Sequence, residues 1–277
     1  MSEPTIPTTG VIADAGKSLA LPVYNDLVHP AAVELGKGLQ TVARTVHLAL
    51  APVSALICGY EKIAEHLTKR LTEKLAGTPP ERIVPPQVNV AGPAIEAMRF
   101  TGGIETLREM YASLLAASMD SATTDDAHPA FVEIIRQLTP DEARILAHIS
   151  NGHRRPVINI HVMNLGPDGG TVTAARWISM IDEQAGLENP GKASIYFDNL
   201  NRLGLTEIPD MIGLTKQGLY DELENHANVL AVRRDFDARD GYRSQIERRF
   251  IALTSLGRQF VSVCVLPRQG EASPPTA

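Results

Sequence analysis

The chain has 277 residues, 44% of them hydrophobic, with a formal net charge of −6 and a pI near 5.8. This length suffices for one large or two ordinary domains, and the negative charge excludes coating of nucleic acid or anionic membrane by bulk electrostatics, so any such contact must be local. Cys58 and Cys264 are the only cysteines and lack metal or redox spacing, and residues 1–10 lack the pattern of a secretory signal, which together predict a cytoplasmic protein without disulfides.

Residues 1–25 are predicted to form a flexible tail, and a long amphipathic helix follows them. From Leu35 to Leu67 apolar residues recur at steps of three and four, which is the pattern of a helix seam. Pro52 interrupts the seam, because proline lacks a backbone donor and clashes with the preceding turn, so we expect a break near Ala51. Charged residues after Glu61 predict a solvated outer face.

The middle of this seam is nearly uncharged. It is shorter than the roughly 20 apolar residues that span a bilayer, so it is predicted either to be buried in a helical bundle or to lie on a membrane surface, and helix base rates favour burial. A peripheral position at the inner membrane is therefore the alternative localisation. The residues that would contact a partner or a membrane are Val46, Leu50, Val53, Leu56 and Ile57.

Residues 77–93 contain five prolines and are predicted to form an extended strap, because proline fixes φ and biases its predecessor toward extended geometry. Their apolar residues favour a strap packed across helices over a free linker. Further helices are predicted at Ala94–Phe100 and Ile104–Met119, and from Phe131 onward. Residues 26–137 are thus predicted to be a helical domain.

Residues 138–266 are predicted to form a second domain, in which helices alternate with short strands. The expected elements are a helix at 140–150, a strand at Val157–Met163, a turn at Gly166–Gly170, helices at Val172–Gln184 and Pro190–Leu203, an extended piece at Leu205–Ile208, an inserted helix at 216–232, an extended piece at Phe250–Leu253 and a closing helix at Ser255–Val265. Without the insertion, this order is that of a winged helix-turn-helix. The expected fold is mainly α, a helical assembly followed by a winged-helix-like α+β domain, with a disordered tail at 267–277.

The second helix of the predicted motif offers a contact surface to DNA or protein. Ile195, Leu200 and Leu203 are predicted to face inward, and the predicted contact residues are Lys192, Ser194, Tyr196, Asn199 and Arg202. The predicted wing is rich in arginine, including Arg248 and Arg249, but acidic residues alternate with these arginines. DNA binding needs several free cations for phosphate contacts, whereas mixed-sign runs usually pair internally. Protein contact is at least as good an interpretation.

No motif indicates catalysis, a cofactor, a metal ion or a small-molecule substrate. His148, His153 and His161 lack carboxylate or cysteine partners at zinc spacing, and Gly36 and Gly38 lack the glycine pattern of a phosphate loop. No nucleophile-elbow motif is present. We therefore expect a protein that is not an enzyme.

Several segments together resemble the Abi-alpha family of bacterial proteins, which is linked to abortive infection. In this defence an infected cell limits the spread of phage. The resemblance covers Asp26 to Val265, and the segments that carry it are DLVHPAAVELG (26–36), GYEKIAEHL (59–67), IVPPQVNVAGPAIEA (83–97), LREMYASLLAASMD (107–120), AHPAFVEIIRQL (127–138), LNRLGL (200–205) and LTSLGRQF (253–260). It implies a role in defence and provides no catalytic residue.

The combined expectation is a non-enzymatic phage-defence protein that acts as a sensor or effector by recognising another protein or a second copy of itself. The first alternative is a membrane-associated effector that uses the apolar helix around residues 46–57. The second alternative is a DNA-binding winged-helix regulator.

Overall fold

The computed structural model describes residues 30–51, 61–101, 104–167, 169–210 and 212–268. Contacts divide the chain into the units Met1–Thr41 and Val42–Ala277. The first described helix, α1 (Pro30–Ala49), ends just before Pro52, which agrees with the predicted break near Ala51. In its described second half Val42, Val46 and Ala49 are buried, as the helix seam predicted. The predicted tail at 1–25 lies outside the described residues.

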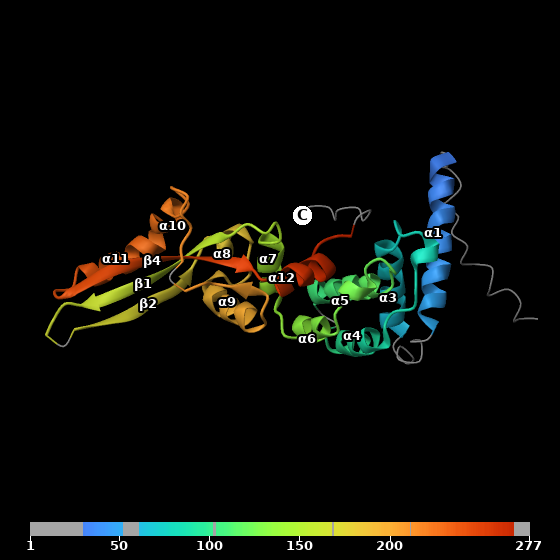
Figure 1. Cartoon of the computed structure of the whole chain (residues 1–277), viewed down its shortest axis with the longest axis horizontal. Coiled ribbons are helices and arrows are strands. Elements are labelled where there is room, and N and C mark those ends of the chain that lie inside the picture. Colours follow the sequence, from blue (N-terminus) through green and yellow to red (C-terminus); the bar gives the residue numbers. More distant parts are fainter. Residues whose placement is uncertain (1–29, 52–60, 102–103, 168, 211, 269–277) are drawn as a thin grey trace, which may run out of the picture. The chain divides into compact units, whose positions relative to one another are not determined.

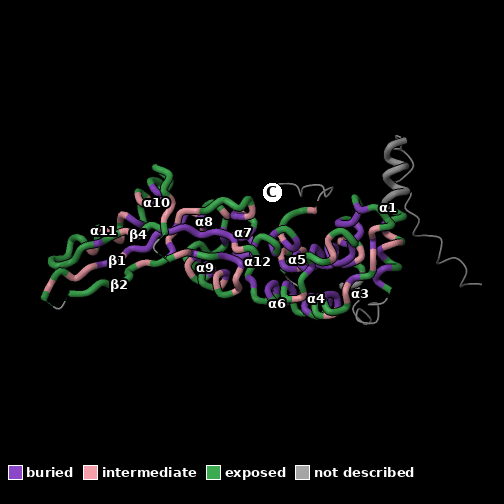
Figure 2. Tube along the Cα trace, viewed as in Figure 1, coloured by how far each residue is buried: buried purple, intermediate pink, exposed green. Residues whose placement is uncertain are grey.

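The helices between residues 61 and 136 pack around α5. They are α3 (Glu61–Lys74), α4 (Val88–Phe100), α5 (Glu105–Ser118) and α6 (Ala130–Arg136). The second half of α5 is buried on all sides, as Figure 2 shows, because α3, α4 and α6 surround it together with later elements of the chain. A helix segment that is buried on all sides belongs to a hydrophobic core. The second half of α5 is the centre of the core that these helices form.

The proline-rich strap is shorter than predicted. Residues 77–87 contain no α-helix and are bonded to the residues that directly follow α5, since the Val84 N–H donates to the Met119 carbonyl (2.8 Å) and Ile83 forms a β-bridge with Asp120. The prediction was wrong from Val88 onward, where α4 begins and includes Pro93. Pro93 lies inside α4, where proline removes one backbone hydrogen bond and crowds the preceding turn. Burial of the helix face around it outweighs that cost.

Helices and a four-stranded antiparallel sheet make up the rest of the chain (Figure 1). The elements in order are α7 (Pro140–His148), β1 (Arg155–Asn164), β2 (Gly170–Ile178), α8 (Ile181–Gln184), α9 (Ala193–Arg202), β3 (Thr206–Glu207), α10 (Asp221–Glu224), α11 (Ala227–Asp237), β4 (Tyr242–Leu253), α12 (Ser255–Phe260) and the π-helical turn η5 (Val261–Val265). The strand order is β2-β1-β4-β3. A capping box formed by Thr139 and Glu142 begins α7, at the helix start that the sequence predicted.

Three predictions for this half were wrong in part. The helix expected at Val172–Gln184 is mostly strand β2, because pairing with β1 and the β-branched residues near Val172 favour extended backbone. The helix expected at 216–232 is divided into α10 and α11. Strand β4 begins at Tyr242, well before the extended piece expected at Phe250–Leu253, and pairs with the whole length of β1.

One hydrophobic core runs from Val42 to Cys264. It continues across residues 137 and 138, where we placed a domain boundary. Phe131 of α6 and Phe260 of α12 pack edge to face in it, with ring centroids 5.2 Å apart, which adds to the burial energy of both rings. A second cluster, which includes Ile158, covers one face of the β1–β2 hairpin with residues of α10 and α11.

Candidate functional site

One side of α9 and its leading residue faces solvent as a continuous stripe. Lys192, Ile195, Asp198 and Arg202 follow one another at steps of three or four residues and are all exposed, so they share one helix face. We call these four residues the α9 stripe. Ile195 is 62% exposed, so the prediction that it faces inward was wrong. The buried face of α9 is formed instead by residues close to Ile195 in the sequence.

Tyr196, a predicted contact residue, is buried and belongs to a polar network with α7. Its hydroxyl donates to Asp141 Oδ2 (3.1 Å), and Asp141 also accepts hydrogen bonds from the Glu188 N–H (2.8 Å), the Asn189 N–H (3.0 Å) and Arg144 (2.7 Å). Burial by itself would raise the pKa of Asp141, but these hydrogen bonds outweigh it and lower the pKa to about 2. Tyr196 therefore fixes α9 to α7.

Two further predicted contact residues of α9 bind it by hydrogen bonds to the residues at and before the start of α7. Asn199 donates to Glu142 Oε1 (2.7 Å) and to the Gln137 carbonyl (3.1 Å). Arg202 donates to Gln137 Oε1 (2.9 Å) and to Asn199 Oδ1 (2.7 Å). Ser194 is half-buried. Of the five contact residues predicted on this helix, the exposed ones are Lys192 and Arg202.

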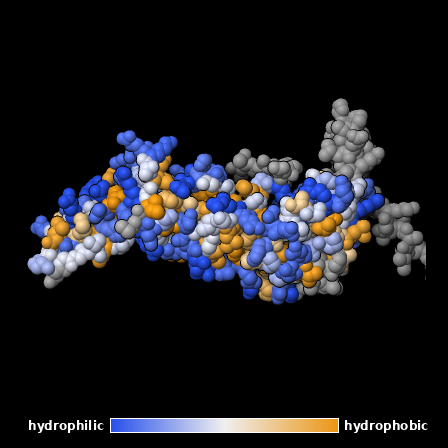
Figure 3. Space-filling view, in the orientation of Figure 1, coloured by the Kyte–Doolittle hydropathy of each residue, from blue (hydrophilic) through white to orange (hydrophobic). Residues whose placement is uncertain are grey.

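Arg248 and Arg249 of the predicted wing are paired with carboxylates. Arg248 donates to both oxygens of Glu224 (2.5 and 3.0 Å), while Arg249 is only 8% exposed and contacts Asp210 (2.6 Å) and Glu247 (2.7 Å). Of these partners, Glu247 lies within the arginine-rich segment, whereas Glu224 and Asp210 lie outside it. On the face drawn in Figure 3, hydrophilic residues predominate around α10 and α11, with hydrophobic residues among them.

A polar network that the sequence did not indicate lies on the sheet face turned away from α10 and α11. Glu247 Oε2 accepts a hydrogen bond from Asn159 Nδ2 (2.8 Å) and lies 3.0 Å from His161 Nε2, and the Thr173 hydroxyl lies 3.2 Å from His161 Nδ1. The hydrogen bond from Arg249, opposed by burial and helped by His161 and Asn159, lowers the pKa of Glu247 to about 2. Glu247 is therefore an anion at neutral pH.

A neutral His161 with its proton on Nε2 satisfies both neighbours, since it donates to Glu247 and accepts from Thr173. A hydroxyl, an imidazole and a carboxylate in this order can orient protons, and here they join β2, β1 and β4. The three residues are far apart in sequence. The one signal that could have revealed them is the polar alternation of Asn159 and His161 in a strand otherwise rich in valine and isoleucine.

Trp177 connects this network to the α9 stripe. Its backbone has φ +58°, the left-handed region that costs a non-glycine residue about 1–2 kcal/mol. The Trp177 N–H donates to Asn159 Oδ1 (3.0 Å), its indole Nε1–H donates to Asp198 Oδ1 (2.8 Å), and the guanidinium of Arg176 lies 4.3 Å from the ring centroid. These contacts stabilise the strained backbone, and they fix Asp198 in the stripe.

The apolar helix proposed for partner or membrane contact is described only in part. Val46 and Leu50 are buried in the core. Val53, Leu56 and Ile57 lie outside the described residues. Within the described part of the chain, none of the helices combines the length and the apolar character needed to span a bilayer.

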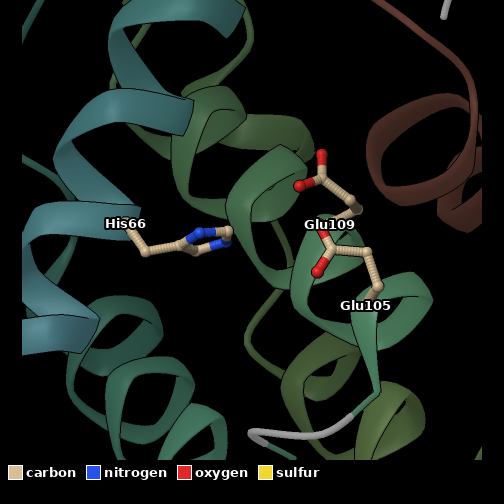
Figure 4. A group of neighbouring side chains, drawn as sticks. All are labelled: His66, Glu105 and Glu109. Atoms are coloured by element: carbon tan, nitrogen blue, oxygen red, sulfur yellow. The ribbon is translucent and has the colours of Figure 1, made fainter.

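Helices α3 and α5 bring together His66, Glu105 and Glu109. One ligand-capable atom of each lies within 4.8 Å of the other two, and Figure 4 shows the imidazole pointing toward the carboxylates of α5. His66 Nε2 is buried without a hydrogen-bond partner among the described residues. The group contains none of the histidines considered from the sequence, His148, His153 and His161.

The carboxylates of this group already have cationic partners. Arg70 lies 3.1 Å from Glu105 and 2.7 Å from Glu109, Lys74 lies 3.4 Å from Glu109, and Arg108 pairs with Glu105. A divalent cation would have to compete with these three cationic side chains for the two carboxylates. We interpret the group as an ion-pair network that joins α3 to α5.

Comparisons with known proteins give one family match. The model of the family described as abortive infection alpha matches residues 59–264, and no curated protein matches. Among solved structures, an uncharacterized protein from the hydrocarbon-degrading marine bacterium Alcanivorax borkumensis SK2 is 20% identical, with a TM-score of 0.32, and the match covers 52% of this chain and 94% of that chain. This structural likeness is too low to support an argument about fold or function.

Proposed function

Because the chain belongs to the abortive infection alpha family, we propose that it is a non-enzymatic phage-defence protein that recognises another protein through the α9 stripe. The family supports the defence role. The surface of α9 supports the mode of action.

The observation that carries the proposal is the composition of the α9 stripe. Lys192 and Arg202 stand at its two ends, while Ile195 and Asp198 occupy its middle, all of them exposed. An apolar residue with a polar rim is typical of protein interfaces. A DNA-reading helix instead needs several cations for phosphate contacts, and Asp198 would face the phosphates. Burial of the Ile195 side chain on a partner would contribute about 1–2 kcal/mol.

The winged-helix interpretation of residues 138–266 is part of the proposal. It is supported by the order of α7, β1, α8, α9, β3 and β4, and by the antiparallel pairing of β4 with both β1 and β3. In that motif the second helix of the helix-turn-helix is the recognition element, which here is α9. The β2 strand and the α10–α11 insertion are additions to the motif.

The two alternatives have weaker support. For DNA binding, Arg248 and Arg249 of the predicted wing are paired with carboxylates, and phosphate contacts by these two residues would have to break those pairs. For membrane action, Val46 and Leu50 belong to the core, so their exposure to lipid would cost the burial that they have in this fold.

The proposal is tested by phage plating on cells that express the wild type, Ile195→Glu or the matched control Ile212→Glu, which alters an isoleucine that is also exposed. We expect Ile195→Glu to lose protection while it keeps the circular dichroism spectrum and melting temperature of the wild type, and Ile212→Glu to protect fully. Full protection by Ile195→Glu would contradict the proposal.

A second measurement separates the DNA alternative. Binding to the promoter of its own gene is followed by fluorescence anisotropy over a salt series, with Lys192→Ala and Arg202→Ala as variants. We expect weak binding that neither variant changes. Tight binding that falls steeply with salt, and less steeply in the variants, would favour the DNA-binding alternative.

A further inference from the structure

Strand β2 is an open edge of the sheet. It stands first in the order β2-β1-β4-β3, and among the described residues β1 is its partner. Residues 170–174 of β2 are all exposed, as Figure 2 shows. The opposite edge strand, β3, has only two residues. Strand β2 is therefore the longer of the two terminal strands of the sheet.

The alternation of hydrogen bonds shows which backbone groups of β2 point outward. The N–H of Leu165, just past the end of β1, donates to the Gly241 carbonyl (2.7 Å), toward β4. Backbone groups alternate in direction along a strand, and Val162 lies three residues before Leu165. The N–H and C=O groups of Val162 therefore point toward β2, where its partner is Val172. Val172 therefore bonds inward, and its two neighbours in β2 direct their N–H and C=O groups to the open edge.

These two neighbours are Thr171 and Thr173, and the edge around them lacks the usual protection. Natural edge strands are blunted by lysine, proline or inward charges, but residues 170–175 read GTVTAA, with neither charge nor proline. Val172 is 65% exposed between the two threonines. Although the whole chain has a charge of −6, two such edges would meet without repulsion, because the first charge along β2, Arg176, pairs with Asp198 (3.4 Å).

We propose that β2 pairs antiparallel with β2 of a second copy of this chain, about a two-fold axis at Val172. This register places Thr171 opposite Thr173 of the second copy, and the reverse by symmetry, so that all four outward groups of each edge form main-chain hydrogen bonds. The two Val172 side chains then lie next to each other on one sheet face. An axis between two residues would oppose outward and inward groups, which cannot pair.

The size of this contact predicts a weak dimer. About five residues of each strand take part over a length of about 17 Å, and they bury roughly half of the ~800 Å² per partner that a stable interface needs. We expect a dissociation constant of about 1 μM or higher. The dimer does not involve the α9 stripe, so the proposed function and this inference are tested by different variants.

Sedimentation velocity of the full chain tests the dimer. The wild type is expected to pass from monomer to dimer between about 1 and about 100 μM. Val172→Asp places two carboxylates on the axis and is expected to raise the dissociation constant at least about tenfold, whereas Ile212→Asp, at another exposed site, leaves it unchanged. A wild type that stays monomeric over this range would overturn the proposal, even if another protein pairs with the edge.

Disulfide crosslinking tests the register. Directly opposed residues in a non-hydrogen-bonded antiparallel pair have Cα atoms about 4.5 Å apart, which lies within the span of a disulfide. In a Cys58→Ser background, Val172→Cys is expected to give a crosslinked pair of chains on mild oxidation, while Ala231→Cys, exposed on α11, stays single. Cys264 is buried and can remain. Absence of the Val172→Cys crosslink, or equal crosslinking by Ala231→Cys, would overturn the register.

Discussion

Asp141 is expected to give the protein a pH-dependent part of its stability, which Asp141→Asn should remove. The carboxylate is 3% exposed and accepts hydrogen bonds from two backbone N–H groups, Tyr196 and Arg144. These hydrogen bonds, which outweigh the opposing effect of burial, lower its pKa from 3.8 to about 2. At about 1.4 kcal/mol per pKa unit, this difference contributes about 2 kcal/mol to the free energy of unfolding.

Because the pKa of Asp141 is lower in the folded state than in the unfolded state, Asp141 stabilises the fold at neutral pH and not in acid. The contribution is complete above the unfolded-state pKa of 3.8 and is lost as the pH falls through the folded-state value of about 2. Denaturant unfolding of the wild type and of Asp141→Asn, from about pH 6 to about pH 2, should show a gap of about 2 kcal/mol that closes toward acid. Glu247 also has a low pKa but is present in both proteins. A gap that stays constant over this range would refute the reasoning.

Two further predictions concern stability. Gly257→Ala should lower the free energy of unfolding by about 3 kcal/mol or more, because a Cβ there would collide with a backbone carbonyl, whereas Gly191→Ala, in open space, should have little effect; equal melting temperatures for these two variants would contradict the close approach. Arg249→Ala should cost about 2 kcal/mol because it removes a buried guanidinium from the partly buried Glu247, whereas its other partner, Asp210, is exposed. The exposed Arg248→Ala should cost less than about 1 kcal/mol. Chemical denaturation measures the free energy of unfolding of both variants. A larger decrease for Arg248→Ala than for Arg249→Ala would be inconsistent with the greater burial of Arg249.

The helices of the first half could be predicted because local signals and packing agree there: their apolar residues recur at the helical period. In the second half, the capping box at Thr139 marks the start of α7. Pro93 was misleading, since it lies inside α4, where burial of the helix face offsets the cost of a proline in a helix interior. Strand β2 could not be predicted, because its extended backbone depends on pairing with β1, and single-strand propensity is weak beside tertiary context.

The candidate site was found in outline but not in detail. The sequence located α9 as the contact element, yet an error of one residue in the helix face exchanged Ile195 and Tyr196 between surface and core. The network of Asn159, His161 and Glu247 depends on the register of β1 and β4, which no local pattern encodes. Long-range pairing of this kind becomes visible only in the folded chain.

Recognition of a protein by the α9 stripe is tested most directly by a photoreactive amino acid at position 195, activated in phage-infected cells. Ile195 is exposed in the middle of the stripe, so a bound partner would cover it. We expect a discrete protein adduct that resists nuclease, and none from the same amino acid at position 212. An adduct that nuclease removes, or equal adducts from both positions, would contradict recognition of a protein partner by this surface.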